Sequence, residues 1–296
     1  MKQLKYNTQL LLTLFTLVIF SILPVFFNLP YRVHIYLPFD GAYRFSIGQT
    51  PYQDFGMPFG YAFFIIPTLF FKIFGASFIS LVYAQVFLNF ISCWSLMKIL
   101  QKLNVNPEVI FLSVFVYCLS YVFIHFWPWH THTAFTYGLL GIWCFLESIE
   151  QEKFFKKLIF VFLSSLFAFL SFFTKQDYGG LAFLFIGILF FADSIFERKF
   201  IPLLFYVFSF LIILILNIKT MPVEFAYWFN HGQAPHSSRL GLMNFLQNIF
   251  GFSEWEKFYL LLIMLVMIPK LNNFKTFLAD KKTVLFFLIT TGMIVE

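Results

Sequence analysis

The sequence predicts an all-α polytopic membrane protein, and two observations carry that prediction. Hydrophobic residues make up 60% of the 296 positions and charged residues only 11%, and the mean hydropathy is +0.82. Soluble domains average about 45–50% apolar and about 25% charged residues. The apolar residues also gather into long runs, as spanning helices of about 20 residues require. The net charge of +6 then reflects lysines beside the membrane and indicates no nucleic-acid partner.

About nine apolar runs are long enough to be transmembrane helices within a single domain, residues 1–296. They are residues 8–27, 77–97, 108–124, 134–149, 156–173, 179–196, 200–217, 257–269 and 283–295. The first run is too long for a cleavable signal peptide. A further short run, 61–74, is expected to lie at the membrane interface. Because the sequence stops at the ninth run, we expect a chain that is incomplete at its C-terminus.

Basic residues predict the orientation of the spans. With a cytoplasmic N-terminus, 13 of the 20 basic residues fall on the cytoplasmic side and seven on the other, as the positive-inside rule requires. All six histidines then lie on the exoplasmic side. So do the two longest loops, 28–76 and 218–256, the first of which includes the expected interfacial helix. We therefore expect the exoplasmic face to carry the function.

The first exoplasmic loop holds two carboxylates, Asp40 and Asp54, among glycines and prolines. Carboxylates at this place could accept a proton from an attacking hydroxyl, hold a divalent cation or bind sugar hydroxyls. The alternative is that both are turn residues, since Asp favours turns and glycine supplies a positive φ. Spacing alone leaves the two interpretations open.

The segments Asp40-Gly-Ala-Tyr43, Gly48-Gln-Thr-Pro51-Tyr52-Gln-Asp54-Phe, Pro58-Phe-Gly60 and Phe-Lys-Ile-Phe-Gly75 resemble the first exoplasmic loop of GT-C-fold glycosyltransferases. The likeness is to bacterial relatives of protein O-mannosyltransferases and lipid A aminoarabinose transferases. It extends loosely over residues 1–200 and is specific over 38–75. Many members place a second acid after the first, whereas Gly41 follows Asp40 here.

The resemblance implies a GT-C-like fold in the bacterial cytoplasmic membrane and an exoplasmic active site. It implies a polyprenyl-phosphate-linked sugar donor and a glycan, lipid or protein acceptor. Asp40 matches the catalytic acid of the family, and Asp54 would assist it. The expected donor-phosphate contacts are Lys175, Arg239 and Arg44, and the expected substrate contacts are Tyr43, Tyr52, Gln176, His130 and His132.

Three of these expectations have alternatives. His130 and His132 could bind a metal or belong to an interfacial aromatic belt. Lys175 could neutralise a lipid-linked phosphate or be a snorkelling lysine in a solvated connector. Arg239 could bind phosphate through its guanidinium or face water. The three cysteines lie in apolar runs and give no disulfide framework.

Glycosyl transfer from a lipid-linked donor is the first function that the sequence indicates. Nucleotide-binding motifs are absent, which favours a lipid-linked donor over a sugar nucleotide. A transporter or flippase would show ionisable residues at span midpoints and paired repeats, whereas the charges lie at span ends. A non-catalytic, truncated membrane subunit is the third possibility.

Overall fold

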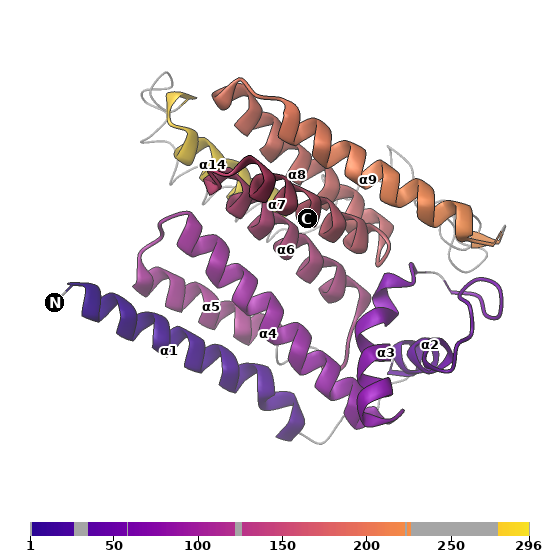
Figure 1. The fold of residues 1–296 in the computed structure, drawn as a ribbon. Helices are drawn as coiled ribbons and strands as arrows, with labels where there is room; N and C mark the ends of the chain where they lie inside the picture. The colour runs from indigo at the N-terminus through magenta and orange to yellow at the C-terminus, as the bar shows by residue number, and fades with distance from the viewer. Residues whose placement is uncertain are drawn as a thin grey trace.

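The computed structural model describes residues 2–26, 35–57, 59–121, 126–222, 224–225 and 278–295, and every regular element within these ranges is a helix. In chain order the elements are α1 (Lys2–Ile22), the 3₁₀ helix η1 (Leu23–Phe26), α2 (Tyr36–Ser46), α3 (Ala62–Phe74), α4 (Phe78–Lys102), α5 (Pro107–Tyr121), α6 (His130–Glu150), α7 (Phe154–Phe172), α8 (Gln176–Glu197), α9 (Ile201–Thr220) and α14 (Lys281–Val295) (Figure 1). The all-α prediction is confirmed for this part of the chain.

Five helical segments are long and apolar enough to cross a membrane. They are Asn7–Phe26, Phe78–Lys102, Phe154–Phe172, Gln176–Glu197 and Ile201–Lys219. The protein is therefore a polytopic membrane protein. The predicted spans 108–124, 134–149 and 283–295 also coincide with helices, α5, α6 and α14. The span 257–269 lies outside the described residues, so the number nine stays a prediction.

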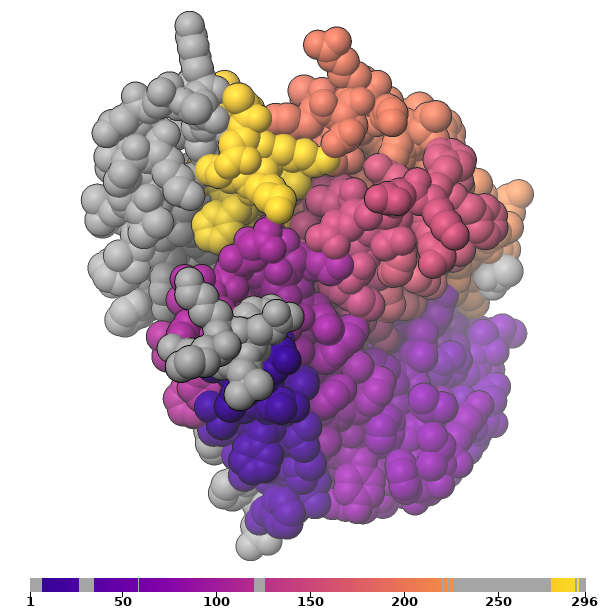
Figure 2. All heavy atoms as spheres, turned by 60° about the vertical axis from the view of Figure 1, so that its left-hand side comes forward, coloured from indigo at the N-terminus to yellow at the C-terminus, as the bar shows by residue number. Residues whose placement is uncertain are grey.

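Large apolar side chains cover the outside of the long helices. On α1, Leu11 and Phe15 are 65% and 63% exposed, and on α9 Phe208 and Leu216 are 59% and 60% exposed. In a soluble protein such faces would be buried; here lipid is the solvent that suits them. In the space-filling view α1 (indigo) and α14 (yellow) lie on the same side of the molecule (Figure 2).

The long helices form two groups (Figure 1). In the first, α1, α4 and α5 pack around a small apolar cluster that includes Leu17, Cys93 and Cys118. In the second, α6, α7, α8 and α9 pack together, with α14 against α8. Contact between α4 and α6 joins the groups. The two short helices α2 and α3 lie together at one end of the bundle.

Small polar side chains set the close approach of helices in the second group. Ser164 and Ser171 of α7 donate hydrogen bonds of 2.8 Å to the carbonyl oxygens of Gly141 and Ala134 in α6. Ser165 donates across 3.0 Å to the carbonyl oxygen of Tyr206 in α9. Hydrogen bonds of this kind hold helices together where neighbouring lipid is as apolar as the helices.

Contacts between helix termini divide the bundle into two ends. At the ionic end (residues 98–108, 147–157, 193–199 and 278–282), Lys102 pairs with Glu150 and Lys281 with Glu197. At the loop end (residues 36–61, 126–132 and 172–178), Ala62 N donates to the Phe173 carbonyl oxygen across 3.3 Å. This grouping agrees with the alternation of the predicted spans. Which end faces the cytoplasm stays a prediction.

Candidate functional site

The segment around Asp40 is helical, which corrects the expectation of a loop. Pro38 is the third residue of α2, in the first turn, where a missing N–H costs no helical hydrogen bond. Gly41 packs against α3, and a Cβ at this position would lie 2.1 Å from Cε1 of Phe64. Both residues look like turn signals in the sequence, yet here they allow a helix to lie against its neighbour. The same contact explains why a second acid cannot follow Asp40 in this chain.

Asp40 and Arg44 form an ion pair on the outside of α2. Arg44 Nε donates to Asp40 Oδ2 across 2.8 Å, and the two side chains are 38% and 60% exposed. The guanidinium also donates to Gln49 Oε1 at 3.4 Å, and its Cζ lies 5.7 Å from the centre of the Phe55 ring. Tyr43, on the same helix, is 43% exposed. Three sequence-predicted site residues therefore share one solvent-accessible helix.

Asp54 builds the turn that follows α2. Its Oδ2 accepts a hydrogen bond of 2.6 Å from Thr50 N, and its own N–H donates to the Thr50 carbonyl oxygen across 2.9 Å. Tyr52 in this turn has a φ of 68°, a left-handed conformation that is uncommon for a bulky residue. Within the described part of the chain, no hydrogen bond or ion pair joins Asp54 to Asp40. A catalytic role for Asp54 stays a prediction.

Two tyrosines, one buried and one half-buried, hold the loop against the bundle. The Tyr52 hydroxyl donates to the Phe59 carbonyl oxygen, and its ring centre lies 5.0 Å from that of Phe225. The Tyr61 hydroxyl donates to Asn217 Oδ1 of α9. Burial raises the pKa of both phenols above its ordinary value. Tyr52 thus supports the loop from inside, and its contact with substrate stays a prediction.

Gly60 fixes the loop to the connection between α7 and α8. A Cβ at Gly60 would lie 1.5 Å from the Phe173 carbonyl oxygen, so only glycine fits here. Two residues after Phe173, Lys175 Nζ lies 3.2 Å from Asp177 Oδ2 and 4.1 Å from the centre of the Tyr178 ring. The Lys175 side chain is 17% exposed. Lys175 is thus on the same end as Asp40, engaged with its own segment.

The two histidines of the first turn of α6 face different neighbours. His130 stacks on Phe59 with ring centres 4.2 Å apart. His132 is 1% exposed, and its Nδ1 lies 3.2 Å from Gln85 Nε2 of α4. They do not converge on one point. Among the residues that the structure describes, no group of three His, Cys, Asp or Glu side chains could hold a metal ion.

Gln176 and Arg239 complete the predicted set. Gln176 opens α8 and is 1% exposed, inside the bundle. Arg239 lies outside the described residues, as does most of the loop 218–256. The site that can be built from the structure is thus Asp40, Tyr43 and Arg44 on α2, with His130 and Lys175 on the same end of the bundle.

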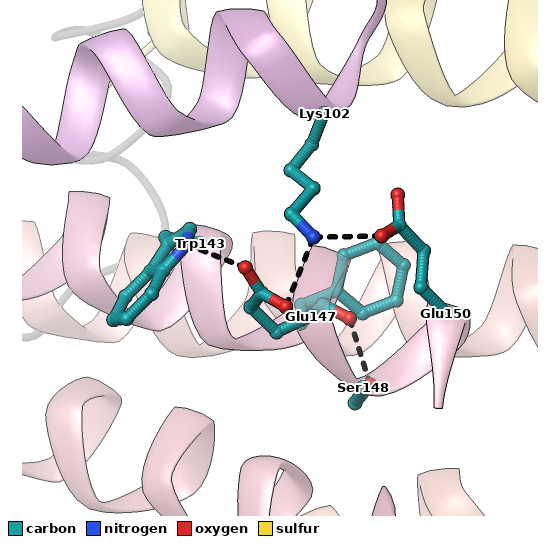
Figure 3. A network of polar contacts seen from close by, with 6 residues as sticks. Lys102, Trp143, Glu147, Ser148 and Glu150 are labelled. Atoms are coloured by element: carbon teal, nitrogen blue, oxygen red, sulfur yellow. Dashed lines mark hydrogen bonds and ion pairs between the residues drawn. The ribbon is translucent and has the colours of Figure 1, made fainter. Parts of the chain in front are cut away.

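Sequence reasoning missed the residues that join helices at the ionic end. Lys102 Nζ of α4 lies 2.9 Å from Glu147 Oε2 and 2.6 Å from Glu150 Oε2 of α6, and Trp143 Nε1 donates to Glu147 Oε1 at 3.1 Å (Figure 3). A signal was present, because two acids three residues apart lie on one helix face.

No match emerges when the chain is compared with protein families, with curated proteins or with solved structures. The likeness to GT-C transferases over residues 38–75 therefore stays a resemblance.

Proposed function

We propose that this protein is a membrane glycosyltransferase. It moves a sugar from a polyprenyl-phosphate donor to a hydroxyl group of a glycan, lipid or protein on the exoplasmic side of a bacterial cytoplasmic membrane. The observation that carries the proposal is the exposed carboxylate of Asp40, held at 2.8 Å by Arg44 on a short helix at one end of the bundle. The resemblance of this segment to GT-C transferases supports it.

Asp40 would act as the general base. Its carboxylate accepts the proton of the acceptor hydroxyl while the hydroxyl oxygen bonds to the anomeric carbon of the sugar. The bond from that carbon to the donor phosphate breaks, and polyprenyl phosphate leaves. A positioned base contributes about 10²–10⁴-fold to such a step. The exposure of the Asp40 side chain, 60%, leaves room for an acceptor to approach.

Arg44 and Lys175 would stabilise the charge of the departing phosphate. A guanidinium offers several N–H donors in a plane that matches phosphate oxygens, and Arg44 uses two of them, toward Asp40 and Gln49. Lys175 adds a second cation at the loop end. Preorganised charge of this kind lowers a barrier because it needs no reorientation during the reaction.

The helix α3 suits a donor that arrives through the membrane. Its 13 residues span about 20 Å at 1.5 Å per residue, which is too short to cross the hydrocarbon core. One face packs on α2 and the bundle, and the other exposes Ile65, Leu69 and Ile73 at 37%, 51% and 61%. An apolar outer face on the helix that packs against α2 supports contact with a lipid-linked substrate.

The test is transfer of radiolabelled sugar from a polyprenyl-phosphate donor pool in membranes that contain equal amounts of each protein. We expect Asp40→Asn to lower transfer by about 10²–10⁴-fold. The matched control is Glu150→Gln, which also removes an exposed carboxylate from an ion pair but at the other end, and it should transfer at the wild-type rate. Equal transfer by Asp40→Asn would remove Asp40 from the mechanism. No transfer by any form, over several donors, would overturn the function itself.

A further inference from the structure

A fully buried polar cluster lies between α4 and α6, apart from the candidate site. Gln85, Asn89 and His132 are 0%, 1% and 1% exposed. Gln85 Nε2 donates to Asn89 Oδ1 across 2.7 Å and lies 3.2 Å from His132 Nδ1. The two amides are seven and eleven residues from the start of α4 at Phe78. That places them about 10 and 16 Å along the helix, inside a segment that is apolar enough to span a membrane.

Each of the two amides in this cluster has a polar atom without a hydrogen-bond partner within the described part of the chain. In the two amides these are Gln85 Oε1 and Asn89 Nδ2, and both are enclosed by protein. Buried polar atoms in native proteins nearly always have a partner, either protein or ordered water. Polar side chains inside a membrane bundle are also costly unless something satisfies them. The two amides therefore call for a ligand that the described residues do not supply.

The chemistry of the two atoms defines the ligand. One is a hydrogen-bond acceptor and the other a donor. Turning over the Gln85 amide alone would set its oxygen against the Asn89 oxygen, so the two amides can turn only together. That rotation leaves a Gln85 nitrogen and an Asn89 oxygen, again one donor and one acceptor. A metal ion needs several acceptors and an anion several donors, whereas a hydroxyl group satisfies one of each.

The enclosure of the cluster limits the size of that hydroxyl compound. Both atoms are covered in the packed structure, so the ligand must enter through a small separation of α4 from α6. Only the smallest hydroxyl compound suits such a site. We propose that Gln85 and Asn89 bind water between α4 and α6, as an internal water site of the bundle. Water donates there to the carbonyl oxygen of one amide and accepts from the nitrogen of the other.

This water has a structural consequence that does not depend on the proposed function. Both of its partners lie on α4, and by satisfying them it holds the Gln85 amide in place. Gln85 Nε2, 3.2 Å from His132 Nδ1, then makes the polar contact of α4 with α6 near the loop end, as Lys102 and Glu147 do at the ionic end across 2.9 Å. A satisfied polar contact fixes the register of two helices more strictly than apolar packing, which tolerates sliding. Polar contacts at two depths therefore hold α4 against α6.

The experiment is water-edited solid-state NMR of the full chain, labelled with ¹⁵N, in bilayers of deuterated lipid. Magnetisation from water should reach the side-chain amides of Gln85 and Asn89 about as fast as it reaches the side-chain amide of Gln53, which is exposed. The backbone amide of Leu88, 0% exposed on the same helix, is the dry reference and should receive it several-fold more slowly. Transfer to Gln85 and Asn89 as slow as to Leu88 would overturn the proposal.

Variants sharpen the assignment. Gln85→Met should slow transfer to the Asn89 amide several-fold, because half of the water site is lost. The matched control is Ser95→Ala on the same helix: Ser95 is equally buried, but its hydroxyl already bonds to the Ile91 carbonyl oxygen at 2.7 Å. It should leave both amides unchanged. Unchanged transfer to Asn89 in Gln85→Met would contradict the shared site. The wild-type comparison with Leu88 decides the proposal even if a variant fails to fold.

Discussion

The two ends of the bundle use charge in different ways. At the ionic end, charged side chains join helices that are distant in sequence: Lys102 links α4 to α6, and Lys281 links α14 to α8. At the loop end, the pairs Asp40–Arg44 and Lys175–Asp177 join residues within one turn of each other. Aromatic rings and main-chain contacts, such as the stacking of Phe59 on His130 at 4.2 Å, hold that end together.

This difference separates residues that the fold needs from residues that it can spare. A charge that joins two helices and is partly buried cannot change partners without loss of stability. An exposed pair four residues apart on one helix is worth only about 0.3–0.5 kcal/mol. The carboxylate of Asp40 can therefore leave Arg44 for a substrate at little cost. The loop end is for that reason the better place for chemistry.

The largest effect should come from breaking the loop end at Gly60. In Gly60→Ala the new Cβ would lie 1.5 Å from the Phe173 carbonyl oxygen, so the loop must move away from the connection between α7 and α8. We expect a loss of more than about 3 kcal/mol, beyond the usual range for overpacking. Thermal unfolding in detergent, followed by tryptophan fluorescence, would measure it. Gly180→Ala is the control, because a Cβ there meets nothing within 4 Å; equal unfolding of the two variants would contradict the anchoring role of Gly60.

The second-largest loss of stability should come from breaking an ion pair at the ionic end. In Lys281→Met, Asp193, whose side chain is 2% exposed, loses the ammonium that lies 2.6 Å from its Oδ1. We expect a loss of about 3 kcal/mol, the low end for a broken buried pair, since Lys281 is itself 26% exposed. Glu197→Gln, which removes only the more exposed partner, should cost less than about 1 kcal/mol. Thermal unfolding of the two variants gives the comparison, and the double variant Lys281→Met with Asp193→Leu should recover most of the loss.

The apolar runs predicted the long helices well, for a simple reason. A membrane span must satisfy its backbone within itself, so its sequence alone decides its structure. The expected span 77–97 corresponds to α4, Phe78–Lys102, and 156–173 corresponds to α7, Phe154–Phe172. Helix pairing could not be predicted, because it depends on contacts such as that of Ser171 with the Ala134 carbonyl oxygen, which leave no pattern in one sequence.

The candidate site was predicted in part. Asp40 was expected in a loop because of Pro38 and Gly41, and it lies on a helix because Gly41 meets Phe64 of α3, a tertiary contact that overrides local turn preference. Its exposure and its contact with Arg44 four residues away follow from that helix. The buried amides were missed, although a Gln and an Asn four residues apart in an apolar run are a signal for a polar site inside a bundle.

The smallest effect concerns pH at the loop end, where a buried phenol rather than an ion pair responds to proton concentration. Burial raises the pKa of Tyr52 in the folded protein, whereas the unfolded chain releases this proton near the ordinary value of about 10. The folded state thus holds the proton longer. Its contribution to stability is complete below about pH 10 and declines above it, by at most about 1.4 kcal/mol per pH unit.

Tyr52→Phe should therefore remove the part of the stability loss above pH 10 that comes from the Tyr52 phenol. At pH 8 it should cost about 1 kcal/mol, the value of the hydrogen bond to the Phe59 carbonyl oxygen. Above pH 10 the difference from the wild type should shrink, because only the wild type continues to lose stability through this group. Unfolding midpoints in detergent at pH 8 and 10.5 would show it. A constant difference between the two proteins at both pH values would mean that Tyr52 does not hold its proton in the fold.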